Sequence, residues 1–126
     1  MAFPAVEGGA VNAAAWQRAI LPLLILRVLS AAPRHGYGIS QALEQGGLHP
    51  IKGAQLYPVL VKLEADGVIV AAWEPGEAGP ARKVYALTDA GRRYLGALEA
   101  EWQGFLDAVN SVGVPAEAPR VPRRRD

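Results

Sequence analysis

Hydrophobic positions along the chain recur at helical spacing in four segments and at strand spacing in two. The first helical segment follows Asn12, a residue type that favours helix N-termini. Its apolar stripe consists of Trp16, Ile20, Leu24 and Val28. Pro22 falls within this stripe, so we expect the helix either to start near Leu21 or to bend at that point.

A second, short helix is expected over residues 36–45, where Ile39 and Leu43 share one face. The pair Gly46-Gly47 ends it, because glycine commonly lies just past the last helical residue. The run Ala-Ala-Pro-Arg-His-Gly at 31–36 separates this helix from the first one. The spacing therefore predicts two helices joined by a short break.

A third helix is predicted over residues 54–65, and Asp66-Gly67 ends it. Its apolar stripe consists of Leu56, Val59, Leu60 and Leu63. Proline fits comfortably only in the first turn of a helix, because it lacks an amide proton. Pro58 therefore indicates that the ordered helix begins near Gln55 or that its first turn is bent.

Two strands are predicted after this helix, at residues 68–73 and 82–87. The segment EPGEAGPA joins them, and Arg82 and Lys83 follow it directly. A helix that leads into a two-stranded hairpin with basic residues near its turn is typical of a winged helix. Such a module places one helix in a DNA groove and the hairpin tip against the DNA backbone.

The last predicted helix begins after Thr88, a favourable N-cap, and Asp89 adds negative charge at the positive end of the helix dipole. Its apolar residues are Leu95, Leu98, Trp102, Phe105, Val109 and Val112. Their spacings alternate between three and four residues, which is the pattern of a helix that pairs with another helix. We therefore expect this helix to form a dimer interface.

Composition indicates a single globular domain, with 51% hydrophobic and 20% charged residues among 126. The chain has no cysteine, which excludes a disulfide scaffold and thiolate metal sites. The apolar run Ala19–Leu29 contains Arg27 and is about half the length needed to cross a bilayer. We interpret it as a core helix rather than a membrane segment or signal peptide, and expect a cytoplasmic protein.

The charge is divided between the body and the C-terminal segment. Residues 1–110 carry nine Lys/Arg and ten Asp/Glu, whereas residues 111–126 carry four Arg and two acidic residues. A nearly neutral body is weak support for nucleic-acid binding, which normally requires a basic surface. The basic residues of the predicted DNA-facing half are Arg34, Lys52, Lys62, Arg82 and Lys83, whereas Glu99, Glu101 and Asp107 lie on the last helix.

Three segments together resemble the PadR-type family of bacterial transcriptional regulators, in its short form with a single C-terminal helix. They are LLILRVLSAAPRHGYGI, LYPVLVKLEADGVI and W…RKVYALTDAGRRYL, and the resemblance covers about residues 21–95. HGY, followed about 20 residues later by LYPxLxxLExDG and then by YxLTxxG, is a specific combination. The wing, GPARKVY, departs from the family because glycine and basic residues are usually denser there.

The resemblance implies a winged helix-turn-helix homodimer that represses transcription by occupying an operator and is released by a small effector. Family dimers pair through their first and last helices. In some short members the symmetric interface encloses an apolar pore, in which central tryptophans stack on flat aromatic ligands. Trp102 falls where the final helix of those members carries that tryptophan.

The third helix indicates candidate DNA contacts independently of the family resemblance. If the leucines face the core, Gln55, Pro58 and Lys62 lie on the outward side. Glutamine can contact adenine, and lysine can reach guanine or a phosphate. Lys52 and Gln55 lie at the N-terminal end, which usually enters the groove. The alternative is that these polar residues simply face water. Tyr57 is expected to pack at the edge of the helix with its hydroxyl free for a phosphate.

Wing residues Arg82 and Lys83 suit backbone phosphates, although such a pair can also be an ordinary solvated turn. His35 and Tyr37 near the second helix are further candidates for phosphate contacts. For Tyr37 we favour the alternative that its ring packs against the first helix.

Aromatic residues at helical or strand spacing most often belong to the core, and this applies to Trp16 and Trp73. Trp102 lies beyond the part of the last helix that one small domain can cover, so we place it at the dimer interface or against a stacked ligand. Phe105 and Trp16 could share that ligand wall. Leu98 and Val109 complete the predicted interface.

Catalytic and metal-binding chemistry find no support in the sequence. His35 and His49 are not accompanied by clustered carboxylates, so a metal site is not expected. There is no Ser/His/Asp array or phosphate-binding loop, and no cofactor is expected. The chain is therefore not expected to be an enzyme.

The sequence thus predicts a mainly α protein with a small β-hairpin, a winged helix-turn-helix followed by a C-terminal dimerisation helix. Its expected parts are a flexible arm (1–11), the DNA-binding domain (12–87), the dimerisation helix (88–112) and a disordered basic tail (113–126). The expected partners are double-stranded DNA, a second copy of the chain and a small effector. The alternative is a ligand-binding or protein-interaction dimer of the same fold without DNA affinity.

Overall fold

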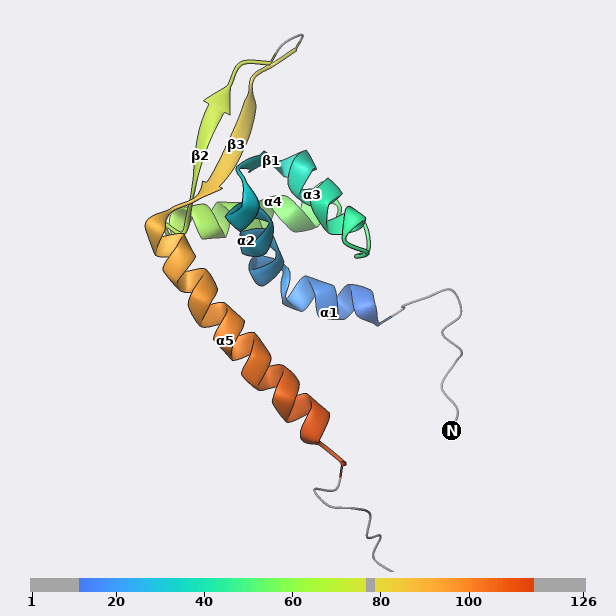
Figure 1. Ribbon diagram of the computed structural model, residues 1–126. Helices are drawn as coiled ribbons and strands as arrows, with labels where there is room; N and C mark the ends of the chain where they lie inside the picture. The colour runs from blue at the N-terminus through green and yellow to red at the C-terminus, as the bar shows by residue number, and fades with distance from the viewer. Residues whose placement is uncertain (1–11, 77–78, 115–126) are drawn as a thin grey trace, which may run out of the picture.

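The computed structural model describes residues 12–76 and 79–114. Within this part, a group of helices carries a small antiparallel sheet that projects from one end, as Figure 1 shows. The elements are α1 (Ala13–Ala19), α2 (Leu21–Ala31), β1 (Arg34–His35), α3 (Gly36–Gln45), α4 (Gly53–Ala65), β2 (Ile69–Glu74), β3 (Arg82–Leu87) and α5 (Asp89–Ser111). The predicted mainly α fold with a winged hairpin is confirmed. The predicted arm and all but two residues of the predicted tail lie outside the described residues.

The first predicted helix is bent, as Pro22 indicated. α1 and α2 meet at Ile20 at an angle of 71°, and Pro22 occupies the first turn of α2. This is where proline is tolerated, because the amides of the first turn have no partner within the helix. The side chain of Asn12 makes no capping hydrogen bond, so only the position of that predicted cap is confirmed.

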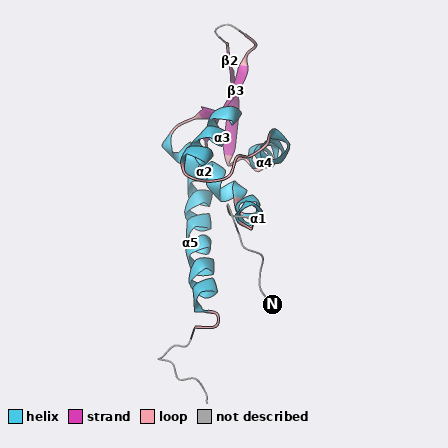
Figure 2. Cartoon of the chain, turned by 90° about the vertical axis from the view of Figure 1, so that its right-hand side faces the viewer, coloured by secondary structure: helices cyan, strands magenta, loops and turns pink. Residues whose placement is uncertain are grey.

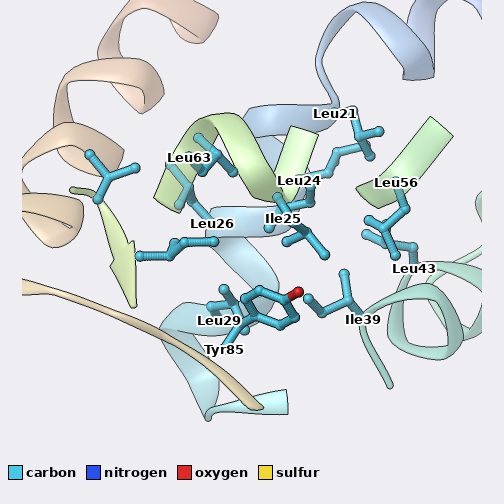
Figure 3. Close-up of a cluster of buried hydrophobic side chains, with 13 residues drawn as sticks. Leu21, Leu24, Ile25, Leu26, Leu29, Ile39, Leu43, Leu56, Leu63 and Tyr85 are labelled. Atoms are coloured by element: carbon cyan, nitrogen blue, oxygen red, sulfur yellow. The ribbon is translucent and has the colours of Figure 1, made fainter. Parts of the chain in front are cut away.

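Helix α2 is the centre of the hydrophobic core (Figure 3). Its buried residues are Leu21, Leu23, Leu24, Ile25, Leu26 and Leu29. Side chains from α3, α4, β3 and the residues around the start of β2 complete the core, namely Ile39, Leu43, Leu56, Leu60, Leu63, Val68, Ile69 and Tyr85. The apolar run Ala19–Leu29 is therefore largely core. No single helix in the described ranges is both long and apolar enough to cross a membrane, although the bent pair α1–α2 passes that test on length and composition.

Helices α3 and α4 form the helix-turn-helix. Gly47 and Gly67 adopt φ values of +100° and +77° just after these helices, which is a conformation that glycine accepts without strain. α4 begins at Gly53, because the carbonyl of Lys52 accepts the amide of Gln55 at 2.8 Å. The helix predicted over residues 54–65 therefore starts one residue earlier, the alternative start near Gln55 is wrong, and the helix continues through the exposed Pro58.

The sheet has the strand order β1-β3-β2, and sequence periodicity did not predict β1. β1 pairs with β3 through Arg34 opposite Tyr85 and His35 opposite Val84. β2 begins one residue later than predicted, because the amide of Val68 donates to the Leu63 carbonyl and closes the end of α4. β2 and β3 extend away from the helices as the wing, which Figure 2 shows from the side.

Helix α5 leaves the body on the side opposite to the wing (Figures 1 and 2). The predicted Thr88 cap is confirmed, because its hydroxyl oxygen accepts the Gly91 amide at 2.9 Å and donates to the Gly67 carbonyl at 2.7 Å. Val112 lies just past the end of the helix rather than within it.

An ion pair joins α5 to α2. The Arg27 guanidinium donates two hydrogen bonds to the Glu99 carboxylate, at 2.7 and 2.5 Å. This hydrogen bonding lowers the pKa of Glu99 and raises that of Arg27, so both groups remain charged over a wide pH range. The pair is exposed, so it adds a directional contact to the packing of Leu95 and Leu98 from α5 against the core.

Gly91→Ala is expected to destabilise the fold by about 2 kcal/mol or more, because the new Cβ would overlap the backbone carbonyl of Val68. Gly96→Ala is the matched control on the same helix. No neighbouring atom lies within 4 Å of a Cβ at Gly96, and alanine favours helix by about 1 kcal/mol over glycine. Urea unfolding measures both free energies. Equal stability of the two variants would contradict the close approach of α5 to Val68.

Candidate DNA interface and apolar helix face

A hollow of about 430 Å³ lies between the start of α3, the exposed side of α4 and the wing. We call it the wing hollow. Its lining residues are His35, Gly36, Tyr37, Tyr57, Val61, Trp73, Ala81, Arg82, Lys83 and Tyr85. Five of the eight predicted DNA contacts therefore meet in one place, although they come from three separate parts of the sequence.

Tyr57 packs at the edge of α4, as predicted. Its ring lies against Gly36 and Gly53, and a Cβ at Gly36 would overlap the ring and its hydroxyl. The glycine of the HGY motif thus makes room for the tyrosine of the LYP motif. This contact holds the ring of Tyr57 in the wing hollow.

Tyr37 and His35 lie beside that ring. Tyr37 is 68% exposed, so the favoured alternative that it packs against the first helix is wrong. His35 is half-buried in β1, and its Nε2 lies 3.5 Å from the Glu74 carboxylate on β2. Both side chains border the wing hollow rather than the core.

Lys83 is held within the wing hollow, whereas Arg82 is exposed. The Lys83 ammonium lies 3.6 Å from the Glu64 carboxylate on α4. It also lies 5.8 and 5.9 Å from the ring centres of Trp73 and Tyr85, within the range of cation–π attraction. Burial raises the pKa of Tyr85, so this phenol stays neutral beside the cation.

The outward face of α4 differs from the prediction at Gln55. Lys52, Pro58 and Lys62 are exposed, and Lys62 pairs with Asp66 at 3.0 Å. Gln55 is instead half-buried, in a small recess that α1 and the α3–α4 loop share with it. The prediction that Gln55 faces outward is therefore wrong.

The same side of α4 shows how α1 holds the helix-turn-helix. The buried side chain of Gln17 donates to the His49 carbonyl at 2.9 Å and accepts the His49 amide at 3.0 Å. His49 lies in the loop that leads into α4. A buried amide satisfied at both ends is a specific contact, because breaking it would leave two buried polar groups without partners.

A second hollow, of about 410 Å³, lies where α5 passes the junction of α1 and α2. We call it the stalk hollow. Its lining residues are Ala19, Ile20, Pro22, Leu23, Tyr94, Leu98, Glu101, Trp102 and Phe105. The rings of Trp102 and Phe105 are 6.4 Å apart and tilted by 35°. Three of the five predicted interface residues therefore meet here.

The other two predicted interface residues do not line the stalk hollow. Trp16 is 69% exposed on α1, so the core alternative for it is wrong, while its place at a dimer interface stays a prediction. Val109 is exposed farther along α5. The apolar seam of α5 changes along its length, from half-buried at Leu98 to 62% exposed at Phe105. Nothing in the described chain covers the seam beyond that point.

Sequence reasoning missed some residues of the wing hollow. Trp73 is 67% exposed and faces Lys83 across the β2–β3 ladder, so its assignment to the core is wrong. The carboxylates Glu64, Asp66 and Glu74, each beside a predicted DNA contact, were also not identified. Helical spacing could have indicated Asp66, four residues after Lys62. Among the described residues, no group of His, Cys, Asp or Glu could hold a metal ion.

Comparison with known proteins connects this geometry with a family. The sequence model of the PadR-like family of transcriptional regulators matches residues 25–97. The chain is 40% identical over 80 residues to transcriptional regulator Rv3488 of Mycobacterium tuberculosis, covering 64% of this chain and 73% of that protein. It is 38% identical over 95 residues to an uncharacterised protein of Lysinibacillus sphaericus, covering 74% of this chain and 87% of that protein.

Solved structures agree with this match. A PadR family transcriptional regulator from Eggerthella lenta superposes with a TM-score of 0.72 at 33% identity, covering 79% of this chain and 86% of that one. A PadR-like transcription factor from Bacteroides fragilis superposes with a TM-score of 0.68 at 31% identity, covering 79% of this chain and 96% of that one. The chain therefore belongs to the PadR-like family of DNA-binding transcriptional regulators, which are not enzymes.

Proposed function

We propose that this regulator is a homodimeric repressor that binds a palindromic operator and is released by a small, flat aromatic effector. The wing hollow is the observation that carries the DNA-binding part of the proposal. It collects Arg82, Lys83, His35 and two tyrosine hydroxyls beside the exposed face of α4. Such groups bind phosphates, while residues on the exposed face of α4 are free to reach base edges.

The exposed seam of α5 supports the homodimer. Phe105 and Val109 expose apolar surface at a spacing that suits pairing with another helix. Trp16 adds a third exposed apolar side chain on α1. A second copy of the chain would cover this surface, and the two α4 helices would enter successive major grooves about 34 Å apart.

The stalk hollow supports the effector. Its volume of about 410 Å³ falls within the usual range for small-molecule sites, and Trp102 and Phe105 supply aromatic walls. An effector here would favour a dimer geometry in which the two reading helices no longer match the operator. It could shift this equilibrium only by its differential affinity for the two geometries. The proposed site of action is the bacterial cytoplasm, with the DNA-bound form at the nucleoid.

The competing function is a dimer of the same fold that binds a ligand or a protein but not DNA. The net charge of −1 over residues 1–110 favours this alternative, because most DNA-binding domains are basic. Salt dependence separates the two functions. Phosphate contacts make DNA affinity fall steeply with salt, whereas an apolar interface changes little.

The DNA-binding prediction concerns Tyr57 and uses a duplex that the protein selects from a random pool. Gly36→Ala is expected to weaken binding to that duplex about tenfold, because the new Cβ displaces the Tyr57 ring and costs one phosphate hydrogen bond. Gly38→Ala is the control, since its nearest neighbour would lie at 3.6 Å, an ordinary contact. Fluorescence anisotropy titration gives both affinities, and equal affinities would remove Tyr57 from the interface.

The dimer prediction concerns the exposed seam. Light scattering is expected to give twice the 13.3 kDa mass of the chain, because α5 needs a partner to cover Phe105. Phe105→Glu should give the monomer mass, since a carboxylate in the seam would be buried without a partner. Gln103→Glu adds the same charge at an exposed position of α5 that lies outside the seam, and should remain a dimer. A wild-type monomer at micromolar concentration would refute the homodimer.

The effector prediction uses acridine, a flat aromatic probe. Acridine is expected to quench tryptophan fluorescence by stacking on Trp102, and Trp102→Ala should lose this saturable response. Trp16→Ala should keep it, because Trp16 does not line the stalk hollow. The same quenching in Trp102→Ala as in the wild type would place the ligand elsewhere.

A further inference from the structure

We infer that Glu64, Asp66 and Glu74 determine specificity by occupying cations that would otherwise hold phosphates of any DNA sequence. This inference rests on the proposed function, because it concerns how the same surface separates an operator from other DNA. The carboxylates act through the neighbouring cations rather than by touching DNA.

The distribution of ion pairs is the first observation. The described ranges contain four carboxylate–cation pairs, and three of them involve a predicted DNA contact. These three are Lys62–Asp66 at 3.0 Å, His35–Glu74 at 3.5 Å and Lys83–Glu64 at 3.6 Å. The His35 pair carries opposite charges only when the imidazole is protonated. The fourth pair, Arg27–Glu99, joins α2 to α5.

The Lys83–Glu64 pair is the most constrained of the three. It joins Lys83 on β3, a residue that lines the wing hollow, to Glu64 on α4, and the Trp73 and Tyr85 rings border the same ammonium. Glu64 thus holds the lysine at a defined place inside the wing hollow. A phosphate that approaches there meets a cation whose charge is already partly neutralised.

The two lysine pairs are open to exchange. Their side chains are between 37% and 74% exposed, so water screens both partners and each pair is weak. The His35–Glu74 pair is the least accessible of the three, because the Nε2 atom of His35 is buried. A phosphate can replace a carboxylate on a lysine, but the gain is smaller than for a lysine without a partner. The carboxylate left behind also repels the phosphate.

The effect differs between operator and random DNA. Binding to random DNA is essentially electrostatic, so each cation that is freed adds to it in many registers. On the operator, base contacts fix a single register, and a freed lysine contributes only where a phosphate lies within its reach. Neutralising a carboxylate should therefore strengthen random binding more than operator binding, and specificity should fall.

The test compares Glu64→Gln with Asp107→Asn. Both remove one negative charge and keep the shape of the side chain, but Asp107 lies near the end of α5 that is farthest from the wing (Figure 1). Anisotropy titrations against a random-sequence duplex and the selected duplex at several salt concentrations give affinities and salt slopes. Thermal unfolding confirms that both variants fold.

Glu64→Gln should bind the random duplex roughly threefold or more tightly, with a salt slope steeper by about one phosphate contact, and gain less on the selected duplex. Asp66→Asn and Glu74→Gln should also bind the random duplex more tightly and gain less on the selected duplex. Adding Lys83→Met should cancel the effect of Glu64→Gln, because Glu64 acts through that lysine. A gain no larger than that of Asp107→Asn, or an equal gain on both duplexes, would overturn the inference.

Failure of the proposed function gives a result that differs from failure of the inference about the carboxylates. If the proposed function is wrong, the wild-type protein selects no duplex over random DNA. The random duplex alone still tests the carboxylates, because a steeper salt slope in Glu64→Gln shows that Lys83 has been released to phosphates.

Discussion

The burial of α2 by its neighbours is the constraint on which the rest of the structure depends. Six of its eleven residues are buried leucines or isoleucine, so the helix is stable in water only if other elements enclose most of its surface. α1, α3, α4, α5 and β3 all pack against it. The exposed helix α4 of the helix-turn-helix and the protruding helix α5 are therefore both positioned by α2. Removing one of its buried leucines, at a cost of about 2–5 kcal/mol, would disturb both surfaces.

The charge around the wing hollow depends on which charged residues lie close together there, more than on the net charge of the chain. The nearly neutral body argued against nucleic acid when residues were only counted. In the structure, Arg82 and Lys83 converge on one hollow, which concentrates positive charge there. Glu64 lies beside Lys83 and reduces that charge. Binding strength therefore depends on which of these pairs a duplex can exchange.

Helical and strand periodicity predicted the elements whose stability comes from their own apolar stripe, such as α4 with Leu56, Leu60 and Leu63. It missed β1, because two residues carry no alternation and their pairing with β3 connects positions far apart in the sequence. It misplaced Gln55, because the neighbour that covers it is α1, whose direction depends on the 71° bend at Ile20. Trp73 was misassigned because strand spacing does not tell which side of a hairpin is covered.

The candidate sites could likewise be predicted only in part from the sequence. Single residues of the right chemistry could be named from the sequence, but their grouping depends on contacts between distant segments. The Gly36–Tyr57 contact joins two motifs that lie about 20 residues apart in the sequence. This contact determines where the phenol ring lies. The wing hollow exists because this ring, β1 and the wing meet there.

Helix α1 links the stalk hollow to the loop before α4. Its last residue, Ala19, lines the stalk hollow, while Gln17, two residues earlier, holds the His49 backbone in the loop before α4. A rotation of α1 by a ligand in the stalk hollow would therefore either move that loop or break two buried hydrogen bonds. Since breaking them is costly, movement of the loop and of the start of α4 is the easier response. Arg27 and Glu99 meanwhile keep α5 attached to α2. Under the proposed function, α1 is therefore the element through which a ligand in the stalk hollow would act on the start of α4.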